Sequence, residues 1–205
     1  MNTYWKLGVS ALAAAVLLAF PEALLAQARR PAPPPAGGPV PEILKKGLKI
    51  EYSLTQTPEY DVNTTENKSS RQQWGVVTVQ YETLPDWVDE LEFRYYVVVH
   101  NKKDDRYTLF PLTVTYMDIA KGKHTATVFL RPNTLARHGA IARAAVEVTF
   151  RGGLIARESI PASDQRWWES PNVTRVEGIL LGRSQTPFAF VSWDNYDAER
   201  IVPGR

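Results

Sequence analysis

The chain has 205 residues, with 24 Lys and Arg, 22 Asp and Glu, and no cysteine. Three basic and one acidic side chain precede residue 42, so residues 42–205 carry 21 of each sign. This balance argues against a nucleic-acid-binding domain, which needs a strong positive field. The lack of cysteine excludes disulfides, thiol catalysis and cysteine-ligated zinc or iron–sulfur sites.

Residues 1–28 have the layout of a secretory signal peptide. One lysine precedes an apolar run from Leu7 to Phe20, and Ala26-Gln27-Ala28 offers small residues at positions −3 and −1 of a cleavage site. The run is shorter than the about 20 apolar residues that a spanning helix needs. We therefore expect an exported chain with no spanning segment after cleavage. Cleavage two residues earlier, or retention of the segment as an anchor, is the alternative.

Residues 29–41, RRPAPPPAGGPVP, predict a tether between the signal peptide and the domain. Six prolines and two glycines in this stretch cannot bury apolar surface, and they favour an extended polyproline-II conformation. The favoured interpretation is a spacer. The alternative is a docking ligand for an aromatic groove, because Pro31, Pro34 and Pro35 offer a P-x-x-P spacing.

From residue 48 onward, apolar and polar side chains alternate, which is typical of strands with one buried face. The clearest run extends from Ala140 to Phe150. In chain order, the pattern predicts strands over residues 48–54, 77–82, 91–99, 110–116, 123–131, 140–150, 154–160, 175–182 and 187–193.

Turn residues separate these strands, and one short helix interrupts them. Asn101–Asp105 is a polar hairpin tip, Lys121–Lys123 is a second turn, and Gly152-Gly153 is a two-residue hairpin turn. A helix is predicted over Pro132–His138, capped by Asn133 or Thr134 and followed by Gly139. Eight or nine strands with one short helix predict an all-β domain over residues 42–205, an immunoglobulin-like antiparallel β-sandwich.

No catalytic motif is present in the sequence. Gly182–Thr186 comes nearest to the G-x-S-x-G of hydrolases but lacks the second glycine, and there is no dinucleotide-binding, P-loop or H-E-x-x-H motif. His100, His124 and His138 lie at ends of predicted elements, and their spacing does not indicate a metal site. We therefore expect no enzymatic activity, no cofactor and no bound metal.

Two aromatic segments are candidates for partner contact. Trp167 and Trp168 are consecutive, so in an extended chain one ring enters the core and the other is left near the surface, where it suits a protein or a sugar ring. Trp193 lies in the second segment, Thr186–Tyr196, which has aromatics on both predicted faces. In both segments a purely structural role is the favoured interpretation.

The whole chain resembles a family of exported, immunoglobulin-like proteins from verrucomicrobial bacteria, encoded near type IV pilus-like genes. The resemblance lies in the start MNTYWKLGVSALAAAVLLAF, the tether RRPAPPPAGGPVPEILKKG and the end RVEGILLGRSQTPFAFVSWDNYDAER. It implies export, the sandwich fold and a pilus-associated context. It implies no catalytic or ligand residues.

Together these observations predict a non-enzymatic exported protein of the periplasm, outer envelope or cell surface. Its expected partners are envelope or pilus-assembly proteins, bound through a sheet edge or through Trp167, Trp168 and Trp193. The alternative is a carbohydrate-binding β-sandwich module that uses exposed Trp rings, and no nucleic acid is expected to bind.

Overall fold

The computed structural model describes residues 42–45, 47–59, 72–171 and 173–200. The predicted signal peptide, residues 1–28, and tether, residues 29–41, lie outside these ranges. Gly37–Arg205 forms one compact unit, and its described residues contain a central hydrophobic cluster and two smaller ones. A unit with its own core is expected to fold independently.

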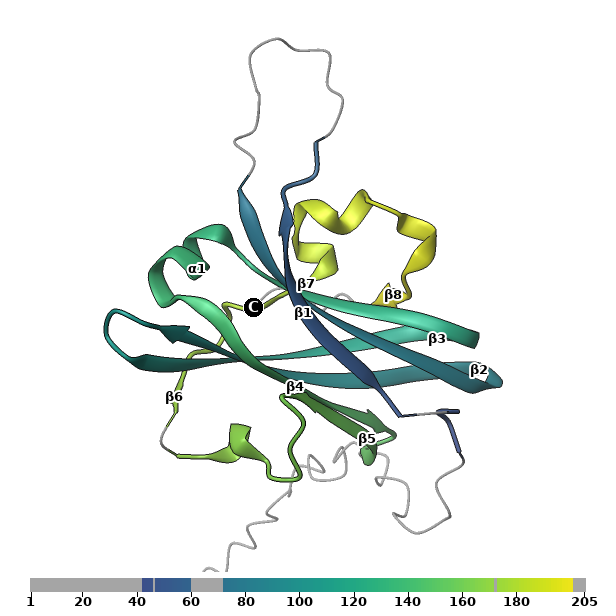
Figure 1. Cartoon of the computed structure of the whole chain (residues 1–205). Helices are drawn as coiled ribbons and strands as arrows, with labels where there is room; N and C mark the ends of the chain where they lie inside the picture. Colours follow the sequence, from purple (N-terminus) through teal and green to yellow (C-terminus); the bar gives the residue numbers. More distant parts are fainter. Residues whose placement is uncertain (1–41, 46, 60–71, 172, 201–205) are drawn as a thin grey trace, which may run out of the picture. The chain divides into compact units, whose positions relative to one another are not determined.

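The structure is mostly antiparallel β-sheet with one short α-helix (Figure 1), as the alternation predicts. The prediction of an all-β, sandwich-like fold is therefore confirmed. No helix in the described ranges is long and apolar enough to cross a membrane. The elements are β1 (Lys49–Gln56), β2 (Gln73–Asn101), β3 (Arg106–Leu130), α1 (Pro132–His138), β4 (Ala140–Phe150), β5 (Gly153–Ile160), η1 (Trp167–Glu169), β6 (Thr174–Arg175), β7 (Leu181–Gly182), η2 (Arg183–Gln185), η3 (Pro187–Phe190), η4 (Trp193–Asn195) and β8 (Ala198–Glu199).

One long hairpin, β2–β3, supplies both layers of the sandwich. Its register shifts between Thr83 and Trp87, and there the hairpin bends back on itself (Figure 1). The ring centroids of Tyr81 and Phe93 are only 5.1 Å apart, although twelve residues of straight strand would span about 40 Å. The predicted strands 77–82 and 91–99 are thus two halves of β2, and 110–116 and 123–131 are two halves of β3.

The other strands extend these two layers. β1 pairs with the first half of β2, and the second half pairs with β4, which in turn pairs with β5. Inward side chains of both layers form the central core, as period-two strands require. Its fully buried members include Val77, Val79, Leu91, Phe93, Tyr95, Val97, Phe110, Val128, Ala144 and Val146.

Two smaller apolar clusters cover the outer faces of the layers. Trp74, Val76 and Phe129 on the first layer are covered by Leu181 and Phe188 from the C-terminal segment. Val98, Leu109 and Ala145 on the second layer are covered by Trp168 from the segment after β5. The chain after β5 therefore seals both outer faces without adding long strands.

The structure corrects several local predictions. The predicted strand 175–182 survives only as the ends β6 and β7, and the predicted strand 187–193 is wrong, because those residues form 3₁₀ turns. The last hairpin turn is Arg151-Gly152, one residue earlier than predicted; both residues have positive φ, as a type I′ turn requires, and Gly153 already pairs with Phe150.

The predicted helix has the bounds found in the structure, but its predicted cap is wrong. Arg131 occupies the N-cap position without a side-chain hydrogen bond, and Pro132 takes the first helical position, where its missing N–H costs nothing. Gly139 follows the helix as predicted.

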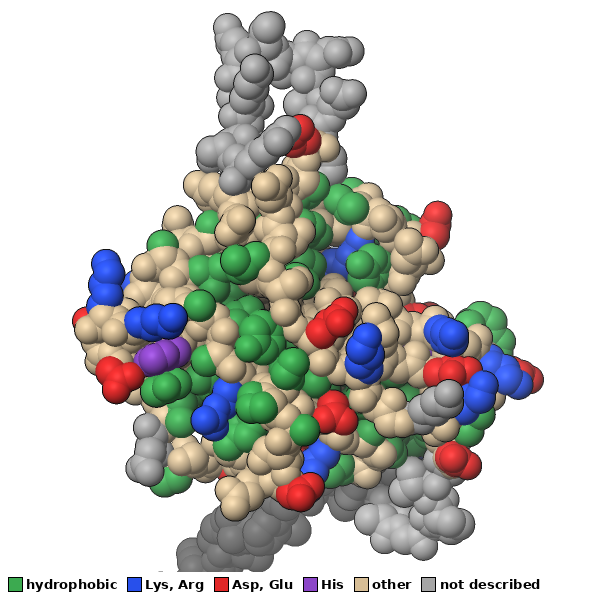
Figure 2. All heavy atoms as spheres, viewed as in Figure 1, with side chains coloured by type: hydrophobic (Ala, Val, Ile, Leu, Met, Phe, Trp, Pro, Cys, Tyr) green, Lys and Arg blue, Asp and Glu red, His purple; other side chains and the backbone are tan. Residues whose placement is uncertain are grey.

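Basic and acidic side chains are interspersed over the face seen in Figure 2. This mixture agrees with the charge balance of residues 42–205.

Candidate functional site: an aromatic surface on the C-terminal segment

The structure places the three candidate tryptophans in two different surroundings. Trp168 is buried, and its ring stacks on Tyr96 at a centroid distance of 5.5 Å. Trp167 meets Trp168 edge-on, with ring planes 88° apart. Two perpendicular rings, one of them buried, do not form the flat exposed platform on which a sugar stacks. The pair packs chiefly against the second layer.

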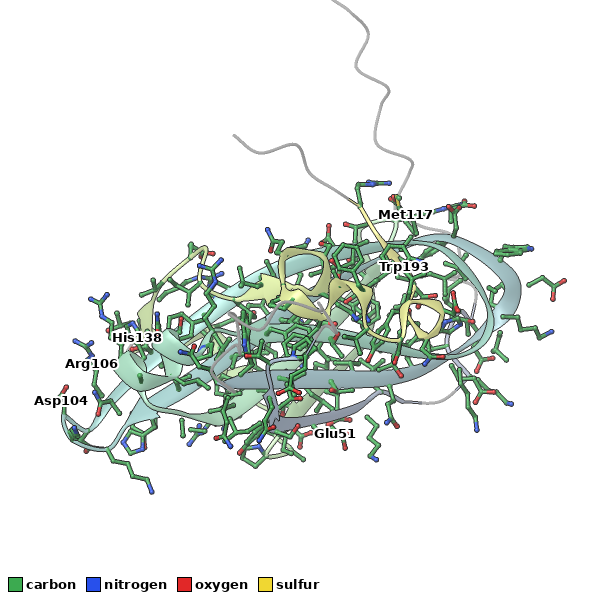
Figure 3. The ribbon with its side chains drawn as sticks, turned by 90° about the horizontal axis from the view of Figure 1, so that it is seen from above. Glu51, Asp104, Arg106, Met117, His138 and Trp193 are labelled. Atoms are coloured by element: carbon green, nitrogen blue, oxygen red, sulfur yellow. The ribbon has the colours of Figure 1, made fainter. Side chains whose placement is uncertain are left out.

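Trp193 is 65 % exposed and lines a pocket on the C-terminal segment. It lies on the C-terminal segment, far from the hairpin tip at Asp104 (Figure 3). The pocket next to Trp167 shares no lining residue with the pocket next to Trp193. The structure thus separates Trp193 from the tryptophan pair.

The segment around Trp193 consists of 3₁₀ turns because local hydrogen bonds replace a sheet ladder. Thr186 Oγ1 accepts a hydrogen bond from the backbone N–H of Phe188 and donates one to the carbonyl of Arg183. Pro187 follows at the first position of η3, where its fixed φ suits a helical turn. Phe188 then points inward and stacks on Phe129 at 4.6 Å.

A buried arginine fixes this segment. One Nη atom of Arg183 donates to the carbonyl of Ala189 at 3.1 Å, and the other donates to the carbonyl of Val191. Its guanidinium also lies 3.7 Å from the ring centroid of Tyr196, a cation–π contact. One side chain therefore holds the turns on both sides of Trp193.

Glu199 joins the two ends of the same segment. Its carboxylate oxygens accept the backbone N–H groups of Arg183 and Ser184, both at 3.0 Å. A Cβ at Gly182 would lie 3.0 Å from this carboxylate, so the glycine permits the close approach. The segment is thereby closed into a loop, anchored to β3 through β7 and β8.

The loop leaves large apolar side chains in solvent. Phe190 is 76 % exposed, and Val191 and Trp193 are exposed as well. Phe190, Trp193 and Tyr196 line one pocket of about 270 Å³, together with Arg183, Ser184, Ala189, Asp197 and Glu199. We call Phe190, Val191, Trp193 and Tyr196 the C-terminal aromatic surface.

A polar cluster of Tyr81, His124 and Asp197 connects the segment that carries this surface to β2 and β3. Asp197 accepts a hydrogen bond from the hydroxyl of Tyr81 at 2.8 Å, and its other oxygen lies 3.1 Å from Nδ1 of His124. Burial, and then the carboxylate of Asp197, raises the pKa of Tyr81 far above its ordinary value, so the phenol stays protonated and donates. Nε2 of His124 lies 2.7 Å from the carbonyl of Ala120.

The histidine side chains and the potential metal ligands of the described residues are dispersed. Among the described residues no three His, Asp or Glu side chains are grouped as metal ligands would be. His100 pairs with Asp105 and His138 packs edge-on against Phe110, so the three histidines lie in separate surroundings. Desolvation, with Arg137 and Arg106 nearby, lowers the pKa of His138.

The sequence indicates Trp193 as a candidate contact residue, but its pattern predicts a strand over residues 187–193. Phe190, the most exposed large apolar side chain described, was expected in that strand, and Arg183 and Trp87 were not singled out. The available signal was the three-residue spacing of Phe190, Trp193 and Tyr196, which matches 3₁₀ turns.

Comparison with known proteins places the domain in a family. No curated protein matches the chain. A crystal structure of a protein from Akkermansia muciniphila, a verrucomicrobium, matches with a TM-score of 0.63 and 21 % sequence identity, covering 76 % of this chain and 96 % of that chain. This likeness shows a shared fold. A protein-family model matches residues 42–201, most of the sequence, and the chain therefore belongs to the family that this model describes.

Proposed function

We propose that this protein is a non-enzymatic envelope or surface protein that works through protein contacts, as an accessory of a pilus-like assembly. The C-terminal aromatic surface is the observation that carries the proposal. Exposed aromatic clusters of this kind are costly in water and are typical of interface anchors. Phe190, Val191 and Trp193 have exposed apolar side chains, and all three lie within four residues of sequence.

The construction of the loop supports the same function. Arg183 and Glu199 fix the backbone on either side of Trp193, so the aromatic side chains are presented on a fixed scaffold. A fixed scaffold lowers the entropic cost of binding, since less chain has to be ordered in the complex. The pilus-like context rests on the resemblance of the sequence to the verrucomicrobial family, and export rests on the signal-like residues 1–28.

Site-specific photo-crosslinking in the cells that produce the protein tests this function. A photoreactive amino acid replaces Trp193 in one variant and Trp87 in another. Trp87 is an equally exposed tryptophan, 67 % against 65 %, on the bend of β2. We expect protein adducts from position 193 and few from position 87, with mass spectrometry identifying pilus or envelope subunits. Equal adducts from both positions, or none from position 193, would contradict the proposal.

A further inference from the structure

The C-terminal aromatic surface has the composition that one kind of ligand requires. Phe190, Trp193 and Tyr196 follow one another at intervals of three residues and line the same pocket. A polyproline-II helix has three residues per turn and presents apolar proline rings along its sides. Aromatic grooves bind such segments by packing their rings against the prolines, at low entropic cost because the ligand is already extended.

We propose that the C-terminal aromatic surface binds the proline-rich segment 29–41 of a second copy of this chain. This inference rests on the proposed function and names the partner of the same surface. The segment RRPAPPPAGGPVP has six prolines and the P-x-x-P spacing that such grooves take. It lies outside the described residues, and the chain therefore carries both a ligand sequence and a surface of matching chemistry.

The charges of the two partners are complementary. Arg29 and Arg30 precede the prolines, and Asp194 lies exposed on η4 directly beside Trp193. Asp197 and Glu199 also line the pocket region, although they already hold His124 and backbone amides. The positive charge of Arg183 is directed at carbonyls and at Tyr196 instead. A ligand arginine can therefore pair with the carboxylate of Asp194 next to Trp193, as a charge-assisted hydrogen bond.

This contact would join two different surfaces of identical chains. Such heterologous contacts extend into rings or filaments, because each copy keeps one unused surface for the next. The geometry therefore suits a protein that is repeated along an assembly.

A peptide-binding measurement tests the inference. The protein is the independently folding unit Gly37–Arg205, and the probe is a fluorescent peptide with the sequence of residues 29–41. We expect saturable binding by fluorescence anisotropy, at least tenfold weaker for Trp193→Ala and unchanged for the matched control Trp87→Ala. A peptide with Arg29 and Arg30 replaced by Gln should bind more weakly and lose its salt dependence, and one with Pro31, Pro34 and Pro35 replaced by Gly should not bind.

The outcomes separate this inference from the proposed function. Failure of the native unit to bind the peptide at millimolar concentration, or equal losses for Trp193→Ala and Trp87→Ala, overturns the inference. If position 193 still crosslinks to an envelope protein in cells, the proposed function stands with a partner of different chemistry. Adducts that join position 193 to residues 29–41 of a second copy support both.

Discussion

Arg183 is buried, and its positive charge is satisfied by carbonyl groups and an aromatic ring. Burying a charge is costly unless hydrogen bonds replace its water shell. The carbonyls of Ala189 and Val191 and the face of Tyr196 do this, and in return the guanidinium satisfies carbonyls of a segment that has no sheet ladder. The side chain of Arg183 therefore helps to fix the backbone conformation of the segment between Ala189 and Tyr196.

We expect Arg183→Ala to lower the free energy of unfolding by about 2–4 kcal/mol, because hydrogen bonds to charged groups are worth about 1.5–3 kcal/mol and their acceptors would be left unpaired. Chemical denaturation measures this change. Limited proteolysis should also cut near Phe190 in the variant. Arg183→Lys keeps the charge but not the two-pronged geometry, so it should restore only part of the stability. Full stability of the Lys variant would show that charge alone is sufficient.

Trp168 is expected to act in stability rather than in direct contact with a partner. It is buried against Tyr96 and Val98, and truncating a buried Trp to Ala typically costs about 3–5 kcal/mol. Its indole N–H has no hydrogen-bond partner in the described part of the chain, so Trp168→Phe should cost much less than Trp168→Ala. Thermal unfolding of the two variants measures the difference. Equal losses would mean that the N–H is satisfied after all.

At the scale of elements, alternation located the strands because it depends only on near neighbours. β1, β4 and β5 follow their predictions closely, since each turns one face toward the central core, although the outer face of β4 is buried as well, with Ala145 under Trp168. The bend in β2 was beyond this signal, because Tyr81 and Leu91 keep the same alternation on both sides of it. Its position depends on contacts between residues far apart in sequence.

The strand prediction for residues 187–193 was wrong for a different reason. Phe188 and Phe190 fit a period of two, but they are also compatible with 3₁₀ turns, in which Phe188 is buried and Phe190 exposed. Hydrogen bonds from Thr186 and Arg183 decide between the two, and such contacts leave no periodic trace in a sequence.

Gly139 connects α1 to β4, and its replacement tests whether this connection requires a glycine. Its φ is +99°, and a Cβ there would lie 2.0 Å from the carbonyl oxygen of His100. Strained φ alone costs about 1–3 kcal/mol, and the backbone clash adds to it. We therefore expect Gly139→Ala to destabilise the protein by more than about 2 kcal/mol in urea denaturation.

Gly47→Ala is the matched control, because a Cβ at Gly47 meets nothing within 4 Å. Its effect should stay within about 0.5 kcal/mol, as for most surface substitutions. Similar losses for both variants would mean that flexibility of glycine in general, and not the contact with His100, limits the stability.

At the scale of the whole molecule, the sequence predicted an aromatic contact site but not its composition. Trp193 was identified by its residue type, whereas its separation from Trp167 and Trp168 follows from which outer face each segment covers. That choice depends on how the chain after β5 crosses the edge of β3, where β6, β7 and β8 pair at widely spaced positions. Short strands of two residues carry no pattern from which this path could be predicted.

Asp197 connects the two layers of the sandwich. It precedes β8, which pairs with the second layer, while its partners Tyr81 and His124 belong to the first-layer halves of β2 and β3. The side chains of Asp197 and His124 are only 13 % and 12 % exposed, so water screens their interaction weakly. The cluster therefore holds the base of the C-terminal aromatic surface on the sheet.

We expect Asp197→Ala to lower the free energy of unfolding by about 2–3 kcal/mol, since it leaves the buried hydroxyl of Tyr81 without its acceptor and removes the carboxylate that lies 3.1 Å from Nδ1 of His124. Asp86→Ala is the control, because Asp86 pairs with Lys121 on the surface at 87 % exposure and should contribute less than about 1 kcal/mol. A double-mutant cycle with His124→Ala should give a coupling of about 1–2 kcal/mol. Coupling near zero would mean that Asp197 acts through Tyr81 alone, and the tie between the layers would then depend on a single hydrogen bond.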